Sequence, residues 1–262
     1  MKLSVILFTI SFLVFVSGAY AALEDGLVSA WTFDDGTAKD NGTGGNNGVI
    51  KGNVKSVAGK TGKAMDFDGV KGSYIEVADK ASLQQDRFTI SAWINVRKGA
   101  DHGAIFFKGD KIGWGANFMA RIATTSDTNL TWGTTFGATE GWFATNNVIK
   151  PNEWSHVCMT ADGTVATAYV AGKVPASGQT NPHESKAPLN KWAGKPVEIG
   201  VGRGVGGTVG NDAFFNGIID QVYFWKRALT AAEVTQLAGG AVLTAVEVKG
   251  KVSTTWGDIK SY

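Results

Sequence analysis

The sequence contains little that would cross-link the chain or give it a strongly charged surface. Its 262 residues include one cysteine and five prolines. A single cysteine cannot form an internal disulfide, so a sizeable apolar core must hold the fold together. The formal charge of +2 is near balance, and no cluster of lysine and arginine lies between aromatic residues. These absences argue against a disulfide-rich scaffold and predict no nucleic-acid partner.

Long apolar runs are also missing after the first 21 residues. The N-terminus combines Lys2, the uninterrupted apolar stretch LSVILFTISFLVFV, and small residues with Ala19 and Ala21 at A-x-A spacing. This pattern predicts a secretory signal peptide over residues 1–21. A membrane anchor is the alternative, but the run is short for a span, which needs about 20 residues. We therefore expect an exported protein, secreted or periplasmic, with no membrane span in its mature chain.

The rest of the composition favours short strands. Glycine and aromatic residues are abundant, and the chain length after the signal peptide suits one all-β domain. In Arg87–Val96, apolar residues alternate with polar ones from Phe88 onward, as in a strand with one face in the core. The segments that we predict as strands are Leu27–Phe33, Arg87–Val96, Ala104–Lys108, Asn117–Ala123, Leu130–Phe136, Val197–Gly202 and Gly217–Lys226.

One helix is predicted near the C-terminus. Thr230 is followed three residues later by Glu233, which is the spacing of a capping box, and Gly239 and Gly240 end the segment. No internal repeat and no second core is evident. The predicted organisation is a signal peptide (1–21), one domain (22–240) and a loosely attached tail (241–262).

The only cysteine lies in a predicted hairpin, Trp154–Lys173, close to a histidine. The turn signal Asp162-Gly163 pairs the two halves, which places His156 and Cys158 on the same face. Their Cα atoms would be about 6.5 Å apart along the strand, which is long for a nucleophile and its base. No neighbour lowers the pKa of the thiol. We therefore interpret both residues as structural side chains on one face of the sheet, with a catalytic pair as the alternative.

Four segments, in order, resemble the laminin-G-like domains of the concanavalin A-like lectin/glucanase class. The hairpin follows W-x-H-V-x-x-T-x-D-G-x-x-x-x-x-Y-V-x-G, and the others are LVSAWTFDDGTAKDNGTGGNNGVIKG, AMDFDGVKGSYIEVADKASL with FTISAWINV, and FFNGIIDQVYFWKRALTAAEV. Together they cover most of residues 27–237. The resemblance implies an all-β fold, a two-sheet antiparallel jelly-roll sandwich with one short C-terminal helix, which agrees with the alternation.

The resemblance also implies a structural calcium ion. Three aspartates, Asp34, Asp40 and Asp220, match positions that often bind an ion in this family. Calcium prefers six to eight oxygen ligands, and the Gly- and Asn-rich loop around Asp40 could supply carbonyl groups. Asp220 is in phase with Val222 and Phe224, so we expect it to face the core and to need a partner. The alternative is that these residues only cap turns and backbone amides.

Catalytic patterns are missing. Glycosidases of this fold class need two carboxylates beside the scissile bond, and many carry them as E-x-D-x-x-E on one strand. Here the nearest pattern is Asp66 and Asp68, which lead into a glycine turn and which we interpret as structural. We therefore predict that the protein is not an enzyme.

Aromatic residues outside the predicted core suggest a ligand surface. Sugars stack on flat aromatic faces, with a few polar groups fixing their hydroxyls. The residues that we predict for such a surface are Trp114, Trp132, Trp142, His102, Asn117 and Arg121. The alternative is that the tryptophans fill the edge of the core. The predicted function is a secreted, non-catalytic module that binds a glycan or an extracellular protein surface. An exported polysaccharide hydrolase or lyase and a purely adhesive protein are the alternatives.

Overall fold

The computed structural model describes residues 23–97, 103–110, 116–123, 126–137, 139–176, 181–204 and 212–243. The predicted signal peptide and most of the predicted tail lie outside these ranges. None of the helices in the described part of the chain has the length and apolarity needed to cross a membrane.

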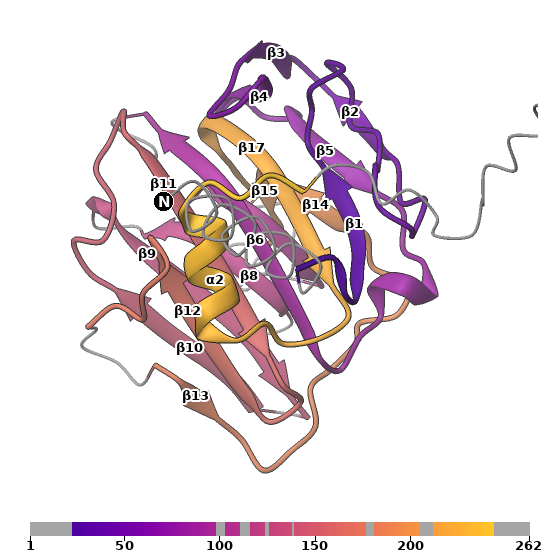
Figure 1. The fold of residues 1–262 in the computed structure, drawn as a ribbon, viewed down its shortest axis with the longest axis vertical. Coiled ribbons are helices and arrows are strands. Elements are labelled where there is room, and N and C mark those ends of the chain that lie inside the picture. Colours follow the sequence, from indigo (N-terminus) through magenta and orange to yellow (C-terminus); the bar gives the residue numbers. More distant parts are fainter. Residues whose placement is uncertain are drawn as a thin grey trace, which may run out of the picture.

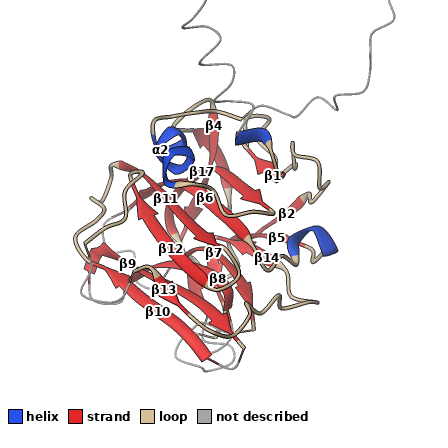
Figure 2. Ribbon diagram, turned by 60° about the horizontal axis from the view of Figure 1, so that its bottom comes forward, coloured by secondary structure: helices blue, strands red, loops and turns tan. Residues whose placement is uncertain are grey.

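The described strands form two large antiparallel sheets that pack as a sandwich (Figure 1). Sheet A has eight strands, in the order β13-β12-β11-β6-β17-β4-β3 with β1 also paired to β17; sheet B has seven, in the order β10-β9-β8-β7-β14-β5-β2. Figure 2 shows the strands in these two layers, with only short helical pieces at the periphery. The all-β sandwich predicted from the sequence is confirmed.

The strands of sheet A are β1 (Leu27–Trp31), β3 (Lys55–Ala58), β4 (Lys63–Asp68), β6 (Phe88–Val96), β11 (Trp154–Ala161), β12 (Val165–Val170), β13 (His183–Glu184) and β17 (Asn216–Trp225). Those of sheet B are β2 (Gly48–Lys51), β5 (Tyr74–Val77), β7 (Ala104–Gly109), β8 (Ala116–Ala123), β9 (Ser126–Phe136), β10 (Thr139–Thr145) and β14 (Val197–Ile199). A small pair is formed by β15 (Val201–Gly202) and β16 (Ala213–Phe214), and the helical elements are η1 (Ala81–Leu83) and α2 (Ala231–Ala238).

The core lies between the sheets. Both sheets contribute large side chains with no exposed surface, including Phe88 and Phe224 from sheet A and Phe118 from sheet B. The rings of Phe88 and Phe118 are 5.2 Å apart, and those of Phe88 and Phe224 are 6.0 Å apart. Such aromatic contacts bury large apolar areas, which stabilises the fold without a disulfide.

The outer face of sheet A is partly covered by the two ends of the domain. The capping box of α2 is present as predicted, and its buried residues Val234 and Leu237 pack on this face (Figure 1). Trp225 donates its indole N–H to the backbone oxygen of Leu23 at 2.7 Å, and Leu243 donates its N–H to the Tyr223 hydroxyl at 3.2 Å. The packed part of the domain thus extends to Leu243, beyond the predicted boundary at residue 240.

The hairpin of β11 and β12 has the predicted faces but a different register. Cys158 lies opposite Tyr169, whereas a two-residue turn would have placed His156 there. The backbone N–H of Asp162 bonds to the oxygen of Val165 at 3.0 Å, and β12 begins at Val165, so three residues connect the strands instead of two. A shift of this size keeps every side chain on its predicted face.

Candidate metal and ligand sites

Asp220 lies on the outer face of sheet A, and this corrects the prediction that it faces the core. Ile219 pairs with Ile94 on the core side, and Asp220 pairs with Trp93 on the outer side. The register then shifts between Asp220 and Tyr223, where Gln221 has a positive φ of 48°. Gln221 is therefore the extra residue of a β-bulge, and the bulge breaks the alternation on which the prediction relied.

The Asp220 carboxylate is buried under the turn between β3 and β4. Its Oδ2 accepts the backbone N–H groups of Lys60 at 2.8 Å and Thr61 at 3.2 Å. A Cβ on Gly59 would lie 2.6 Å from the same oxygen, so only glycine allows this approach. The second oxygen, Oδ1, is buried and has no hydrogen-bond partner. A buried, unpaired carboxylate oxygen is costly, and it is the strongest sign of a missing partner at this site.

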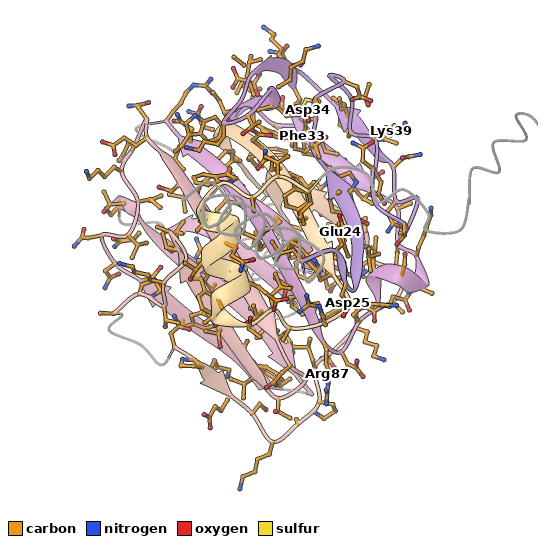
Figure 3. All side chains as sticks on the ribbon, viewed as in Figure 1. Glu24, Asp25, Phe33, Asp34, Lys39 and Arg87 are labelled. Atoms are coloured by element: carbon orange, nitrogen blue, oxygen red, sulfur yellow. The ribbon has the colours of Figure 1, made fainter. Side chains whose placement is uncertain are left out.

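Asp34 reaches the same turn from the end of β1. Its Oδ1 accepts the backbone N–H of Lys63 at 3.2 Å, and it lies at the end of the molecule that carries the β3–β4 hairpin (Figure 3). Burial raises the pKa of Asp220 to about 6, and the negative charge of Asp34 adds to this effect against the backbone hydrogen bonds. The charge of Asp34 thus adds to the cost of ionising Asp220, and a cation beside the two carboxylates would relieve that cost.

The backbone is strained beside both aspartates. Phe33, directly before Asp34, has a φ of 62°, and Gln221, directly after Asp220, has a φ of 48°. Left-handed backbone costs of order 1–3 kcal/mol for such residues, and it often occurs at sites that hold a ligand.

Asp40 does not join this pair. Its Oδ1 accepts the N–H groups of Ala30 and Gly42, each at 2.8 Å, and its Oδ2 accepts the N–H of Asn46 at 2.7 Å. Among the described residues, no three histidine, cysteine, aspartate or glutamate side chains cluster closely enough to hold a metal ion. The structure thus brings Asp34 and Asp220 to one turn, while backbone amides engage both oxygens of Asp40; calcium binding by the three aspartates stays a prediction.

The structure places the predicted ligand residues in different environments. Trp132 is corrected to a core residue, because its side chain has no exposed surface, donates to the Thr145 hydroxyl at 3.1 Å and stacks on Phe143. Arg121 is half-buried on β8. The structure assigns Asn117 to β8 and Trp142 to β10 without describing their side chains, and His102 and Trp114 lie outside the described residues.

His156 and Cys158 are not placed for catalysis. Cys158 is fully buried, and burial raises the pKa of its thiol, so the thiol stays protonated. Burial lowers the pKa of His156 to about 3, and its ring packs edge-on against Trp93 at 5.4 Å. Both residues form part of the outer wall of sheet A, as their positions in the hairpin predict.

The carboxylates that neighbour each other on the strands are engaged by cations. On sheet B, Glu76 pairs in register with Glu198, but Arg203 donates its Nε–H to Glu198 at 2.8 Å. On sheet A, Asp66 forms an ion pair with Arg97 at 2.6 Å. A general acid and its partner must be able to exchange protons with a substrate, and ion-paired carboxylates are poorly suited to this.

The predictions from the sequence did not use the pattern that best marks the candidate metal region. The turn of residues 59–62 reads GKTG, and glycines at its two ends permit the close approach of Asp220 and Asp34 respectively. This spacing is visible in the sequence, but its meaning depends on contacts with residues about 30 and 160 positions away.

Comparisons with known proteins agree with this architecture. The profile of the concanavalin A-like lectin/glucanases superfamily, laminin G type, matches residues 68–235. No curated protein matches the sequence. Among solved structures, domain 4 of AbnA, an extracellular arabinanase from Geobacillus stearothermophilus in complex with arabinotriose, is 22% identical, with a TM-score of 0.58 over 81% of this chain and 98% of that one.

Two toxin domains are also similar. The binding domain of Paraclostridial Mosquitocidal Protein 1 is 21% identical, with a TM-score of 0.63 over 83% of this chain and 53% of that one. The binding domain of Botulinum neurotoxin serotype D is 14% identical, with a TM-score of 0.62 over 85% of this chain and 52% of that one. This chain therefore spans about half the length of both toxin domains. At these identities the likeness shows the fold alone.

Proposed function

Since the chain belongs to the concanavalin A-like lectin/glucanases superfamily, we propose that it is an exported, non-catalytic carbohydrate-binding module. The proposal is supported by similar structures: two toxin binding domains and an arabinanase domain solved in complex with arabinotriose. Fold likeness alone does not assign a function, so the proposal depends on a surface of this chain.

The observation that carries the proposal is a row of partly exposed positions on the outer face of sheet B. Arg121 on β8 pairs in register with Thr131 on β9, which pairs with Ala144 on β10. All three are half-buried, whereas their neighbours Ile122 and Leu130 are in the core. The Thr131 hydroxyl beside the small side chain of Ala144 gives an open surface that can hydrogen-bond sugar hydroxyls, whereas Nε and Nη1 of Arg121 are buried.

The predicted aromatic residue is near this row. Trp142 lies two positions before Ala144 on β10, in register with Gly133. Asn117 is on the same strand as Arg121. We propose Arg121, Thr131 and Trp142 as the centre of the carbohydrate surface, with Asn117, His102 and Trp114 as its predicted surroundings.

We further propose that calcium stabilises the domain. Asp34 and Asp220 would hold the ion with their carboxylates, and the unpaired Oδ1 of Asp220 would gain its missing partner. The ion would neutralise the two charges and tie the end of β1 to β17 through a shared ligand set. Its role would be structural, because Asp220 is buried and cannot reach a ligand in solution.

Export is part of the same proposal. The N-terminal pattern of Lys2, an apolar run and Ala19–Ala21 predicts cleavage after Ala21. Expression with the N-terminus intact, followed by sequencing of the protein recovered outside the cytoplasm, tests this directly. A protein that keeps residues 1–21 and stays in the cell contradicts it.

The carbohydrate proposal is tested by glycan-array screening of the mature chain, followed by titration of each positive oligosaccharide. Thr131→Val should weaken binding by about tenfold, because the hydrogen bonds of its hydroxyl to the sugar are lost. Thr164→Val is the matched control, since Thr164 is exposed in the turn between β11 and β12 of sheet A. Equal affinities for wild type and Thr131→Val would contradict a carbohydrate surface on sheet B. Release of reducing ends from a bound polysaccharide would instead show an enzyme.

A further inference from the structure

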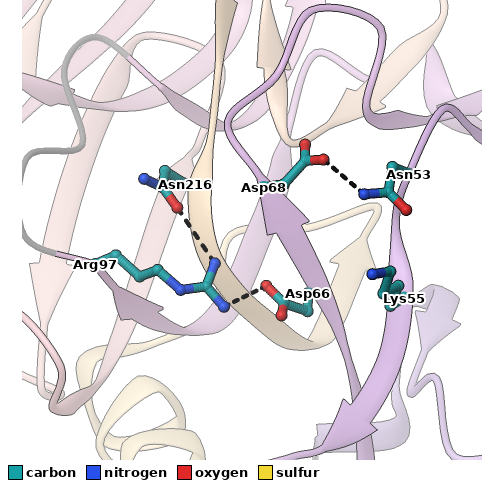
Figure 4. Close-up of a pocket in the computed structure, with 6 residues that line it drawn as sticks. All are labelled: Asn53, Lys55, Asp66, Asp68, Arg97 and Asn216. Atoms are coloured by element: carbon teal, nitrogen blue, oxygen red, sulfur yellow. Dashed lines mark hydrogen bonds and ion pairs between the residues drawn. The ribbon is translucent and has the colours of Figure 1, made fainter.

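A second polar pocket lies on the outer face of sheet A, away from the proposed surface on sheet B. It has a volume of about 270 Å³, and its lining residues are Asn53, Lys55, Asp66, Asp68, Arg97 and Asn216 (Figure 4). The β3–β4 hairpin and Asn53, two residues before β3, supply one wall. The end of β6 and the start of β17 supply the other. Residues from four parts of the chain therefore converge on a single opening.

The side chains of the pocket are held in place by one another. Arg97 donates from Nη2 to Asp66 at 2.6 Å, and from Nη1 to the Phe67 backbone oxygen at 3.0 Å and to Asn216 at 3.2 Å. Across the pocket, Asn53 donates to Asp68 Oδ2 at 2.9 Å. A ligand that binds here would meet groups that are already ordered, and this lowers the entropic cost of binding.

Some polar atoms of the pocket remain free for a ligand. Within the described part of the chain, Lys55 Nζ and the second oxygen of Asp66, Oδ2, make no hydrogen bond or ion pair. The pocket thus offers an acceptor at Asp66 on β4 and a donor at Lys55 on the neighbouring strand β3. Burial alone would raise the pKa of Asp68, but hydrogen bonds from Val70 and Asn53 lower it below its usual value, so Asp68 stays ionised as an acceptor.

The charges of the pocket indicate the class of ligand. Lys55 and Arg97 are balanced by Asp66 and Asp68, so no excess charge attracts an anion or a cation. The mixture of donors and acceptors instead suits hydroxyl groups, each of which can donate and accept. A neutral ligand with several neighbouring hydroxyls matches this pattern best.

The surface beside the pocket provides apolar contact. Asp66 pairs in register with Ile218, Ile218 with Asn95, and Asn95 with Trp154. Ile218, Asn95 and Trp154 are each half-buried, so the row is open to solvent. Three strand spacings separate Asp66 from Trp154, about 14 Å. Isoleucine and tryptophan can contact the C–H faces of sugar rings, while Asn95 can reach their hydroxyls.

We propose that the pocket formed by Asn53, Lys55, Asp66, Asp68, Arg97 and Asn216 binds a neutral sugar residue, and that Ile218, Asn95 and Trp154 extend the site along an oligosaccharide. The site is separate from the sheet B surface of the proposed function. Two sites on opposite sheets would let one module cross-link two polymer chains or bind one chain at two points, which raises the overall affinity.

The test is a nuclear magnetic resonance titration of the isotope-labelled mature chain, because it reports where a ligand binds. The probes are glucose, galactose, xylose, arabinose and N-acetylglucosamine and their oligomers, with sialic acid and sulfated galactose as charged comparisons. A neutral sugar should shift the side-chain amide signals of Asn53 and Asn216. Oligomers should also shift the indole N–H of Trp154 and bind more tightly than the monomer.

Two variants sharpen the assignment. Asp66→Asn keeps the shape of the side chain but removes its charge, so neutral sugars should bind about tenfold more weakly and the charged comparisons should gain affinity. Trp154→Ala should weaken binding of oligomers but leave monosaccharide binding at the pocket unchanged. Glu153→Gln is the matched control for charge, because Glu153 is exposed next to Trp154 and its ion-pair partner is Lys150.

The possible results separate this inference from the proposed function. Shifts at Asn53 and Asn216 support the pocket whether or not sheet B responds. Shifts confined to β8, β9 and β10 support the proposed surface and overturn the pocket. No shift at the pocket with any neutral probe, or tighter binding of the charged comparisons by the wild-type protein, overturns it as well. If Asp66→Asn does not fold, the chemical-shift changes of the wild-type protein alone test the proposed pocket.

Discussion

Asp40 and Asp220 are both buried aspartates on the same sandwich, but their surroundings differ in one respect. Asp40 accepts three backbone N–H groups with its two oxygens, all from residues within ten positions of it in the chain. Asp220 accepts N–H groups from a turn about 160 positions away, and only through one oxygen. Both oxygens of Asp40 are hydrogen-bonded, whereas one buried oxygen of Asp220 has no hydrogen-bond partner.

The difference shows that burial of a carboxylate does not by itself indicate a metal. A buried charge is tolerated when hydrogen bonds replace those of water. Asp40 meets this condition and orders its own glycine-rich loop. Asp220 meets it only in part, next to a second carboxylate and two residues with left-handed backbone, and this is the basis of the proposed calcium ion. The predictions below test this contrast, from the largest effect to the smallest.

Asp40→Ala should cause the largest loss of stability. Three buried N–H groups would lose their acceptor, and we expect the free energy of unfolding to fall by about 4 kcal/mol. Denaturant unfolding with and without calcium measures this. The loss should be the same in both conditions, since the proposed ion is held by Asp34 and Asp220. A loss that added calcium reverses would show that Asp40 is a metal ligand after all.

Gly59→Ala should destabilise the turn that covers Asp220. The new Cβ would lie 2.6 Å from Asp220 Oδ2 and 2.9 Å from the backbone of Lys63, and neither can move freely. We expect a loss of about 2 kcal/mol from overpacking and a weaker response of the melting temperature to calcium. Wild-type stability together with a wild-type calcium response would mean that the turn is not closed over Asp220.

His156 should make the domain sensitive to acid. Its pKa is lowered by burial to about 3, from a usual value of 6.5. Between these values the unfolded chain binds the proton more readily, so stability is complete above about pH 6.5 and is lost as the pH falls towards 3. The slope should approach about 1.4 kcal/mol per pH unit. His156→Gln should flatten the pH profile of unfolding, and an unchanged profile would show that His156 is not the group responsible.

Cys158→Ala should have the smallest effect. The thiol is a buried apolar group, so its loss should cost about 1 kcal/mol and leave carbohydrate binding intact. Thermal melting and the glycan titration are compared with those of wild type. Loss of binding in a variant that melts normally would show that the thiol takes part in function.

The sequence predicted those elements that depend on neighbouring residues. The capping box of Thr230 and Glu233 and the two faces of the Cys158 hairpin are confirmed, because each follows from local periodicity or spacing. The strand Gly217–Lys226 was predicted within one residue at each end. The orientation of Asp220 was wrong, because a bulge at Gln221 adopts backbone that favours glycine and leaves no sign in the residue pattern.

The sites were harder to predict because they form between distant segments. Trp132 was placed at a ligand surface since β10 was not recognised as a strand, and without β10 its stacking partner Phe143 is unknown. The pocket on sheet A combines Asp66 with Arg97 and Asn216, which no local pattern connects. Only the register of four strands brings these residues together.

One measurement tests the contrast between the two aspartates most directly. Melting curves are recorded for metal-free wild type, Asp220→Asn and Asp40→Asn, each with calcium, with magnesium and with a chelator. Calcium should stabilise the wild type by about 2.7 kcal/mol at a hundredfold excess over its Kd, and magnesium should do less because it demands tighter octahedral geometry. We predict that Asp220→Asn loses this shift and that Asp40→Asn, though less stable, retains it. Wild-type curves that overlay with calcium and with chelator, or a shift lost in Asp40→Asn and kept in Asp220→Asn, would contradict the account.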